Sequence, residues 1–180
     1  MTSKLVFDKT MGRLCPGGAR TLCLALCGLL LGICPRAVAQ TMTAFDAPWA
    51  GANALCVSTV AQSINPQGAI VGWYVDENCH PRGFLRAADG TFTKVDPPGA
   101  DWSLPQSINP EGAIAGWYVD ANGKHGFLRA PDGTFTAFDI PGAGIYGPTP
   151  TGINPGGSII GYFDGVQGIY LSVRGFVWRP

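Results

Sequence analysis

Ser63–Asp76 reads SINPQGAIVGWYVD and Ser107–Asp120 reads SINPEGAIAGWYVD, so one stretch of the chain is written out almost twice. The two copies differ at only two positions, and a looser third copy, INPGGSIIGY, begins at Ile153. Self-similarity at a fixed period is the sequence signature of a protein that uses one small structural unit several times. The sequence therefore predicts a repeat architecture, and it describes the shape of the molecule better than it describes a reaction.

The middle copy shows the whole unit, in which turn residues separate four short segments rich in Val, Ile, Phe, Trp, Tyr and Thr. The expected strands are Ser107–Pro110, Ala113–Asp120, His125–Ala130 and Thr134–Asp139. Asp132-Gly133 is the pair that most readily accepts the positive φ of a tight hairpin. Gly and Pro interrupt the chain too often for helices. Each unit is expected to be a four-stranded antiparallel meander of about 44 residues.

The second strand of the unit predicts how neighbouring units pack. Both of its faces are apolar or small in Ala69–Asp76, and such a strand is normally covered on both sides. Gly72, Gly116 and Gly161 recur inside this strand, where a side chain would block the close approach of another backbone. A buried second strand and a more polar fourth strand are typical of a propeller blade that packs between two neighbours.

The sequence thus predicts an all-β fold of three four-stranded antiparallel units, arranged like a β-propeller as a partial or assembled ring, with a β-trefoil-like fold as the alternative. The expected units are residues 60–100, 104–143 and 149–180. The last unit contains only three strands, whereas Thr41–Ala47, TMTAFDA, matches the fourth strand alone. We therefore expect the segment at 41–47 to close the last unit by pairing with Gly175–Trp178.

The first 39 residues are expected to be a secretory signal peptide. A basic start is followed by an apolar run at Thr21–Cys34 and by the small residues Ala37 and Ala39, with cleavage expected before Gln40. The run is shorter than the ~20 residues that cross a bilayer, so a retained N-terminal anchor is the weaker alternative. Met11 could be the true start. The mature domain, residues 40–180, is expected to be secreted or periplasmic, with no membrane attachment after cleavage.

The charge of the mature domain excludes one broad class of partner. The whole chain has a formal net charge of +0, but residues 40–180 carry seven basic and eleven acidic side chains. Nucleic-acid binding rests on basic side chains that neutralise phosphates. A mildly acidic domain without a basic cluster is therefore not expected to bind nucleic acid.

The motifs INPxG, GxIxGWYVD, HGFLRA, DGTFT and DxPGA together resemble the extracellular HAF-type repeats of bacterial secreted proteins. The resemblance covers essentially the whole mature chain and is best over Ser107–Ala143. It implies export and a β-propeller-like array, and it implies no reaction. The histidine of the HGF element stands only at His125, because Arg82 and Arg174 occupy the matching positions.

The function expected from these features is that of a non-catalytic binding or interaction module. Its partner would be an unidentified protein or glycan, and self-association could complete a ring. The alternative is a lectin-like carbohydrate binder, because aromatic side chains on loops can stack on sugar rings. The candidate ligand-contact aromatics are Trp49, Trp102, Tyr146 and Tyr170, each of which could instead cap the core between units.

An extracellular hydrolase is the less favoured third possibility. The chain contains no G-x-S-x-G motif, and Ser63 and Ser107 stand at positions shared between copies, where residues normally serve the scaffold. His80 and His125 are interpreted as exposed turn residues, since a zinc site needs three or four converging ligands. We expect no catalytic residue, no bound metal and no cofactor.

Two cysteines remain after the signal peptide, and a disulfide between them is expected. Cys56 lies in an enlarged link between units, and Cys79 lies in an enlarged turn between the second and third strands. In a four-stranded meander both connections emerge at the same end of the unit, and exported domains commonly contain disulfides. A Cys56–Cys79 bond would stabilise the fold by about 3 kcal/mol in the loop-entropy treatment.

Overall fold

The computed structural model describes residues 40–51, 58–143, 146–167 and 170–180. The chain divides into two units, Met1–Met42 and Thr43–Pro180, and the fold below is that of the second unit. The expected signal peptide at residues 1–39 lies outside the described residues. Within the described residues the structure is all-β, with eleven strands and no α-helix.

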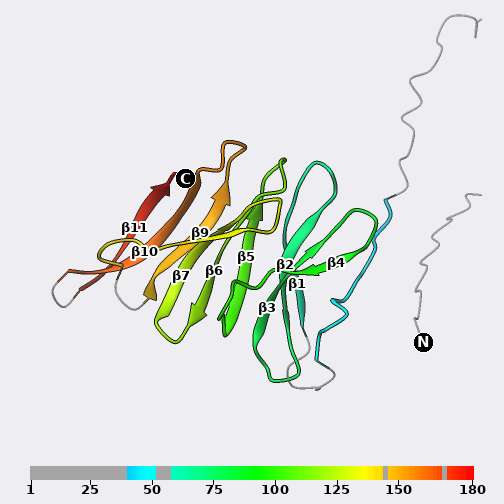
Figure 1. Cartoon of the computed structure of the whole chain (residues 1–180), viewed down its shortest axis with the longest axis horizontal. Helices are drawn as coiled ribbons and strands as arrows, with labels where there is room; N and C mark the ends of the chain where they lie inside the picture. Colours follow the sequence, from blue (N-terminus) through cyan, green and yellow to red (C-terminus); the bar gives the residue numbers. More distant parts are fainter. Residues whose placement is uncertain (1–39, 52–57, 144–145, 168–169) are drawn as a thin grey trace, which may run out of the picture. The chain divides into compact units, whose positions relative to one another are not determined.

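The strands form three antiparallel sheets that follow one another in sequence order (Figure 1). The first sheet has the order β1 (Thr59–Ile64), β2 (Ile70–Val75), β3 (Pro81–Arg86) and β4 (Phe92–Lys94). The second has the order β5 (Trp102–Ile108), β6 (Ile114–Asp120), β7 (Gly123–Arg129) and β8 (Phe135–Phe138). The third has the order β9 (Pro148–Ile153), β10 (Ile159–Gln167) and β11 (Tyr170–Trp178).

The expected meanders are confirmed, with differences at their ends. Each repeat forms its own antiparallel sheet, and its strands pair in chain order. The first strand of the middle repeat is longer than expected, because it begins at Trp102 rather than at Ser107. Pro105 lies inside that strand at a register shift between Pro105 and Ser107. A β-bulge of this kind accommodates a proline, which cannot donate a ladder hydrogen bond.

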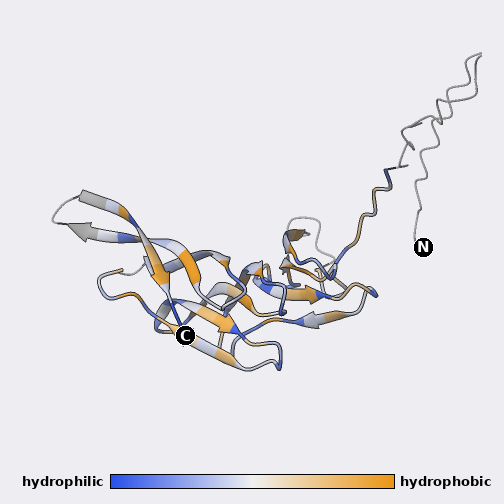
Figure 2. Cartoon of the chain, turned by 90° about the horizontal axis from the view of Figure 1, so that it is seen from above, coloured by the Kyte–Doolittle hydropathy of each residue, from blue (hydrophilic) through white to orange (hydrophobic). Residues whose placement is uncertain are grey.

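Apolar side chains from successive sheets pack together to form the cores. Between the first and second sheets, Val71 and Val95 pack with Ile108, Ile114, Tyr118 and Phe127. Between the second and third sheets, Ala115 and Phe138 pack with Ile159, Phe176 and Trp178. Figure 2 shows hydrophobic stretches within the strands and hydrophilic ones mostly in the turns. The expectation that the second strand is covered on both faces is therefore confirmed for β2 and β6.

The recurring glycine of the second strand lies under an aromatic ring from the third strand of the same sheet. Gly116 pairs with Phe127 across β6 and β7, and a Cβ at Gly116 would lie 2.7 Å from the Phe127 ring. The same Cβ would also meet the backbone oxygen of Leu104 in the first strand. Gly72 with Phe84 and Gly161 with Phe176 repeat this arrangement. The glycine is thus required by a ring and a bulged neighbouring backbone together.

One asparagine from each repeat joins the three sheets through hydrogen bonds. The side-chain amide of Asn65 donates to the backbone oxygen of Asn109 over 3.4 Å. The side-chain amide of Asn109 donates in the same way to the backbone oxygen of Asn154 over 3.1 Å. Each side-chain oxygen also accepts a backbone N–H four residues later in its own turn, from Ala69, Ala113 or Ser158. This asparagine ladder fixes each turn and ties it to the next repeat.

The expectation for the segment at 41–47 was wrong. These residues form no strand, and the third sheet contains only three strands in the described part of the chain. Phe45 instead packs on the first sheet, with its ring centroid 6.2 Å from Phe84, and the Arg86 guanidinium lies 5.0 Å from its centroid. Ala47 and Trp49 extend the same cluster over Tyr74.

The position of the segment at 41–47 follows the packing of the matching segments in the other repeats. Phe45 corresponds in sequence to Val95 and Phe138, which lie directly after β4 and at the end of β8 and pack on the sheet that follows. Phe45 likewise packs on the sheet that follows it in the chain. The first sheet therefore has a cap at its outer face, and the array is not closed by its own N-terminal segment.

Replacing Asn109 with alanine is expected to destabilise the fold by about 2–3 kcal/mol, because it leaves the backbone N–H of Ala113 without its acceptor and removes the donor that joins this turn to the backbone oxygens of Asn154 and Pro155. Asn109 is 2% exposed, and its side chain bonds Ala113, Asn154 and Pro155. The matched control is Asn154→Ala, since Asn154 is exposed and its side chain makes only the bond to Ser158 among described residues. Urea unfolding of both variants measures the difference, and equal losses would contradict the ladder.

Candidate functional site

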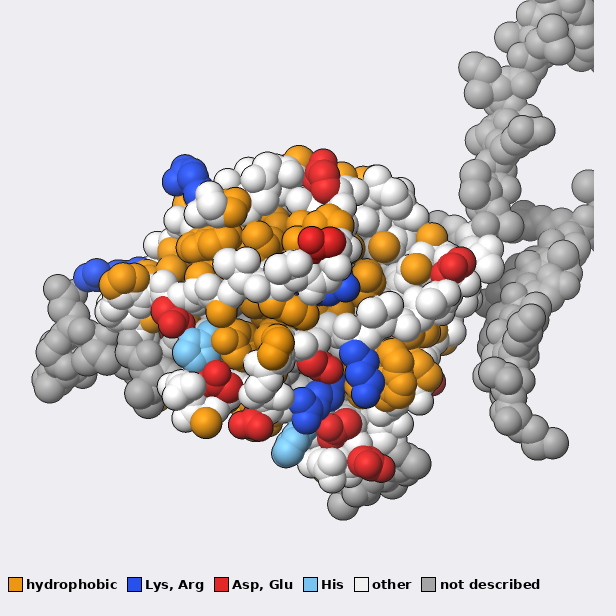
Figure 3. Space-filling model, viewed as in Figure 1, with side chains coloured by type: hydrophobic (Ala, Val, Ile, Leu, Met, Phe, Trp, Pro, Cys, Tyr) orange, Lys and Arg blue, Asp and Glu red, His pale blue; other side chains and the backbone are white. Residues whose placement is uncertain are grey.

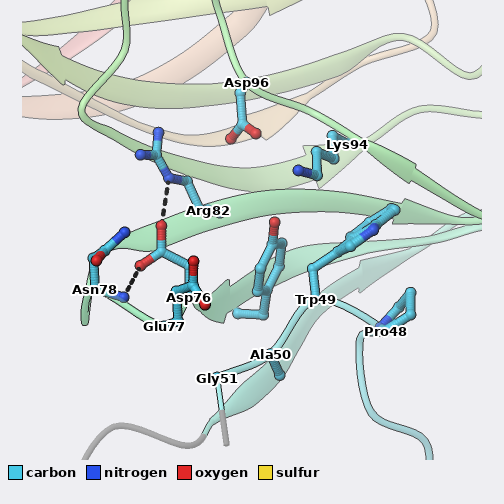
Figure 4. A pocket seen from close by; sticks show the side chains of 11 residues that line it. Pro48, Trp49, Ala50, Gly51, Asp76, Glu77, Asn78, Arg82, Lys94 and Asp96 are labelled. Atoms are coloured by element: carbon cyan, nitrogen blue, oxygen red, sulfur yellow. Dashed lines mark hydrogen bonds and ion pairs between the residues drawn. The ribbon is translucent and has the colours of Figure 1, made fainter. Parts of the chain in front are cut away.

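A cavity of about 640 Å³ opens between the N-terminal segment and one end of the first sheet (Figure 4). Its walls come from the capping segment, the turn after β2, and the facing parts of β3 and β4. The described lining residues are Pro48, Trp49, Ala50, Gly51, Tyr74, Asp76, Glu77, Asn78, Arg82, Lys94 and Asp96. Two aromatic side chains and several charged groups thus converge on one cavity, and convergent polar groups beside aromatic ones are a feature of small-ligand sites.

The turn between β2 and β3 orients the acidic wall of the cavity. Asp76 Oδ1 accepts the backbone N–H groups of Asn78 at 2.9 Å and His80 at 3.0 Å, while Oδ2 accepts from Arg82 Nε at 3.1 Å. Partial burial opposes the charge of this carboxylate, but these hydrogen bonds and the guanidinium outweigh it and lower the pKa of Asp76. Asp76 is therefore a fixed anion at the rim.

Arg82 crosses the site and is held at two points. Besides its bond to Asp76, its guanidinium donates through NH1 to the backbone oxygen of Ala100 over 2.9 Å. Asp96 stands on the other side, where its Oδ1 accepts the backbone N–H of Gly83 over 3.0 Å. Burial raises the pKa of Asp96 despite this bond and the nearby Arg82 and Lys94. The site thus places two carboxylates in unequal surroundings.

The aromatic part of the cavity is built from Trp49 and Tyr74. Their ring centroids lie 5.8 Å apart, and Phe92 supports the indole edge-on at 6.4 Å. Lys94 Nζ lies 5.2 Å from the Trp49 centroid, a cation–π distance. Burial, together with Asp96, raises the pKa of Tyr74 to about 12, so its hydroxyl stays protonated at physiological pH.

The second sheet repeats the acidic pair around a different cation. His125 corresponds to Arg82, and its Nδ1 lies 2.7 Å from Asp139 Oδ1 while its Nε2 lies 3.2 Å from Asp120 Oδ1. The ring also lies 5.2 Å from Tyr118, the counterpart of Tyr74. Only the protonated imidazole can donate from both nitrogens at once. Burial opposes this charge, but the two carboxylates outweigh it and raise the pKa of His125.

The interpretation of His125 as an exposed turn residue was therefore wrong, because both of its ring nitrogens contact carboxylates. The third sheet has Arg174 and Phe163 at the corresponding positions but Gly165 in place of Asp120. In Figure 3, acidic, basic and histidine side chains gather along the lower edge of the molecule, below a band of apolar side chains. A cation between two aspartates is thus a shared feature of the first two repeats.

The four candidate aromatics do not form one site. Trp49 lines the cavity, whereas Trp102 is exposed at the start of β5 and Tyr146 is exposed just before β9, and neither is among the described lining residues. Tyr170 begins β11, and its side chain lies outside the described residues. The proximity of Arg82 and Lys94 to Trp49 could not be foreseen from their positions in the sequence. The signal that marks this site is a departure from the repeat, since Gly99 and Gly142 match Trp49 and Ala137 matches Lys94.

The disulfide stays a prediction. Cys79 lies in the turn between β2 and β3 with a φ of 64°, while Cys56 lies among residues 52–57, outside the described part of the chain. Among the described residues, no group of three or more His, Cys, Asp or Glu side chains is placed to hold a metal ion. The turn at Asp120 instead caps its own backbone, with Asp120 Oδ1 accepting from Asn122 over 2.7 Å.

Comparison with protein-family models finds no match to this chain, and comparison with curated proteins finds none either. The described residues include no helix of the length and apolarity needed to span a membrane. The site is therefore interpreted from its own geometry.

His125 should make the stability of the fold depend on pH. A histidine whose pKa is raised on folding stabilises the folded state below its unfolded pKa of about 6.5, and this contribution is lost as pH rises through the folded pKa. The free energy of unfolding should therefore fall as pH rises from about 6.5 through the raised folded pKa of His125, and His125→Gln should flatten that part of the profile. His80→Gln is the matched control, and an unchanged slope in His125→Gln would contradict the role of the two carboxylates.

Proposed function

We propose that this protein is a secreted, non-catalytic binding module of the HAF-repeat type, with its ligand site in the cavity beside Trp49. The observation that carries the proposal is the convergence of an indole, three carboxylates and two cations on one cavity of about 640 Å³. Aromatic faces supply contact area, and fixed polar groups orient a ligand. The β-propeller-like arrangement of the repeats is part of the same proposal, supported by separate sheets that pack face to face.

Two features favour binding over catalysis. None of the described lining residues is a serine, threonine, cysteine or histidine, so the usual side-chain nucleophiles with an attached base are missing from that set. Two of the three lining carboxylates also act structurally, because Asp76 fixes a turn and Asp96 holds the backbone of Gly83. The second repeat keeps the same two acids around His125, as a shared scaffold feature would require.

Between a protein and a carbohydrate, the side chains of the cavity favour a carbohydrate as the ligand. A sugar presents an apolar C–H face that stacks on an indole and hydroxyl groups that bond carboxylates, guanidinium and ammonium groups. Trp49, Asp76, Lys94 and Arg82 offer these partners together. The lectin-like function is therefore the second candidate, and a protein ligand that inserts a polar side chain into the cavity remains the broader form of the proposal.

Binding should depend on the cavity residues. A glycan array and a proteomic pull-down with the whole chain, purified from a host that exports it, would identify the ligand. Lys94→Ala and Trp49→Ala should each weaken that binding about tenfold or more, the effect of losing ~1.4 kcal/mol or more of contact energy. Trp102→Ala is the control, because Trp102 is an aromatic residue that is 44% exposed outside the cavity.

The outcomes separate the candidates. Binding to glycans that is lost in Lys94→Ala but kept in Trp102→Ala supports the lectin-like function, and the same pattern with a captured protein supports the broader binding module. Release of reducing sugar from a bound glycan would contradict the non-catalytic proposal. Equal binding by all three variants would show that the ligand binds elsewhere than in the cavity.

A further inference from the structure

The outer face of the third sheet leaves apolar side chains in water at positions that the other sheets bury. Val71 and Ala115 are 0% exposed because the following sheet covers them, whereas Ile160, their counterpart in β10, is 52% exposed. Ile160 pairs with Val177 across β10 and β11, so the two side chains share a face. Tyr162 and Val173 extend this exposed apolar surface, which we call the tail face.

The tail face contains a groove, and the corresponding place on the second sheet is filled by a side chain of the third sheet. The groove has a volume of about 410 Å³, and Asn154, Ile160 and Val177 contribute to its walls. At the corresponding place on the second sheet, Ile153 of the third sheet packs against the buried cluster that contains Ala115. The repeat itself therefore indicates what fills such a groove, namely the first-strand isoleucine of another repeat.

The opposite end of the array exposes that isoleucine. Ile64 in β1 is 64% exposed, whereas its counterpart Ile108 in β5 is 7% exposed because it packs against the first sheet. We call this end, around Ile64, the head face. The head face thus offers the kind of side chain that the groove of the tail face lacks.

The asparagine ladder is also incomplete at both ends, in complementary ways. The backbone oxygens of Asn109 and Asn154 each accept a side-chain amide from the preceding repeat. Among the described residues, the backbone oxygen of Asn65 accepts only the turn N–H of Gly68, and the Asn154 side-chain amide donates to nothing. One end therefore has a spare acceptor and the other a spare donor.

The third sheet has an open strand edge that matches a segment near the head face. In the first two sheets the third strand, β3 or β7, is paired with a fourth strand, β4 or β8. In the third sheet β11 has no such neighbour among the described residues and is the edge strand. Thr43–Phe45 reads TAF, as Thr136–Phe138 does in β8. Phe45 already packs on the first sheet as Phe138 packs on the third, so Thr43–Phe45 could pair with β11 of another copy without repacking.

We propose that a second copy of this chain docks head to tail on the tail face. Ile64 of the second copy enters the groove beside Ile160, Asn154 donates to the backbone oxygen of Asn65, and Thr43–Phe45 extends the sheet at β11. The contact reproduces the two interfaces between sheets within one chain. Such a head-to-tail contact gives a ring where the rotation closes and an open filament where it does not.

The test is the mass in solution of the whole chain, purified after export and measured by light scattering during size-exclusion chromatography. The expected mass is two or more times that of a single copy. Ile160→Lys blocks the tail and Ile64→Lys blocks the head, and each should shift the mass to that of one copy. Both residues are exposed in a single chain, so each variant should keep the circular dichroism spectrum of the unchanged chain and should still unfold cooperatively.

Mixing the two variants gives the discriminating measurement. Every contact between copies of one variant contains the substituted residue, whereas a mixture offers one intact head and one intact tail. An equimolar mixture should therefore form a pair with twice the single-copy mass, and Trp102→Lys should associate like the unchanged chain. A single-copy mass for the unchanged chain, no effect of either variant, or no pairing in the mixture would each overturn the proposal.

Discussion

The structure depends on the fact that every sheet is apolar on both of its faces. A sheet of this kind cannot keep its hydrophobic side chains out of water by itself, so each repeat is stable only against a neighbour. Val71 and Ala115 show the result, since both are fully buried by the sheet that follows. The glycine under the phenylalanine ring in each sheet leaves room for that ring and for the backbone of the first strand of the same sheet.

Apolar packing alone would allow neighbouring sheets to slide, and the asparagine ladder removes that freedom. Hydrogen bonds are directional, and buried polar groups that lack partners are costly, so Asn65 and Asn109 specify one offset between successive turns. The ladder also gives the array a direction, because each side-chain amide donates to the repeat that follows. The apolar residues of the repeated motif thus hold neighbouring sheets together, and its asparagine sets the offset between them.

The strand content and the repeat boundaries could be predicted from the sequence, because near-identical copies must fold alike. The position of the segment at 41–47 could not, since its likeness to a fourth strand says nothing of which sheet it contacts. Phe45 followed the rule of Val95 and Phe138, which is visible only when side-chain packing is known. His125 was misread for a related reason, because Asp120 and Asp139 approach it from separate strands and turns.

The cavity shows how a repeat scaffold acquires an individual site. Positions shared by the copies, such as Asp76 and Asp120, hold turns together, whereas Trp49 and Lys94 stand where the other copies have Gly and Ala. The latter, together with Arg82 in place of His125, distinguish the site beside the first sheet from the matching part of the second. A search for function in such a chain is therefore best directed at the differences between its copies.

The linking segment after each fourth strand has a consequence for how such a molecule can grow. Because it ends one repeat and covers the next, a tandem duplication of the coding segment for one repeat carries both halves of the new interface with it. The inserted repeat would meet the same kind of surface on either side as the existing repeats do. Lineages could thus lengthen or shorten the array by whole repeats, with no compensating substitutions elsewhere, while Trp49 and its surroundings stay untouched at one end.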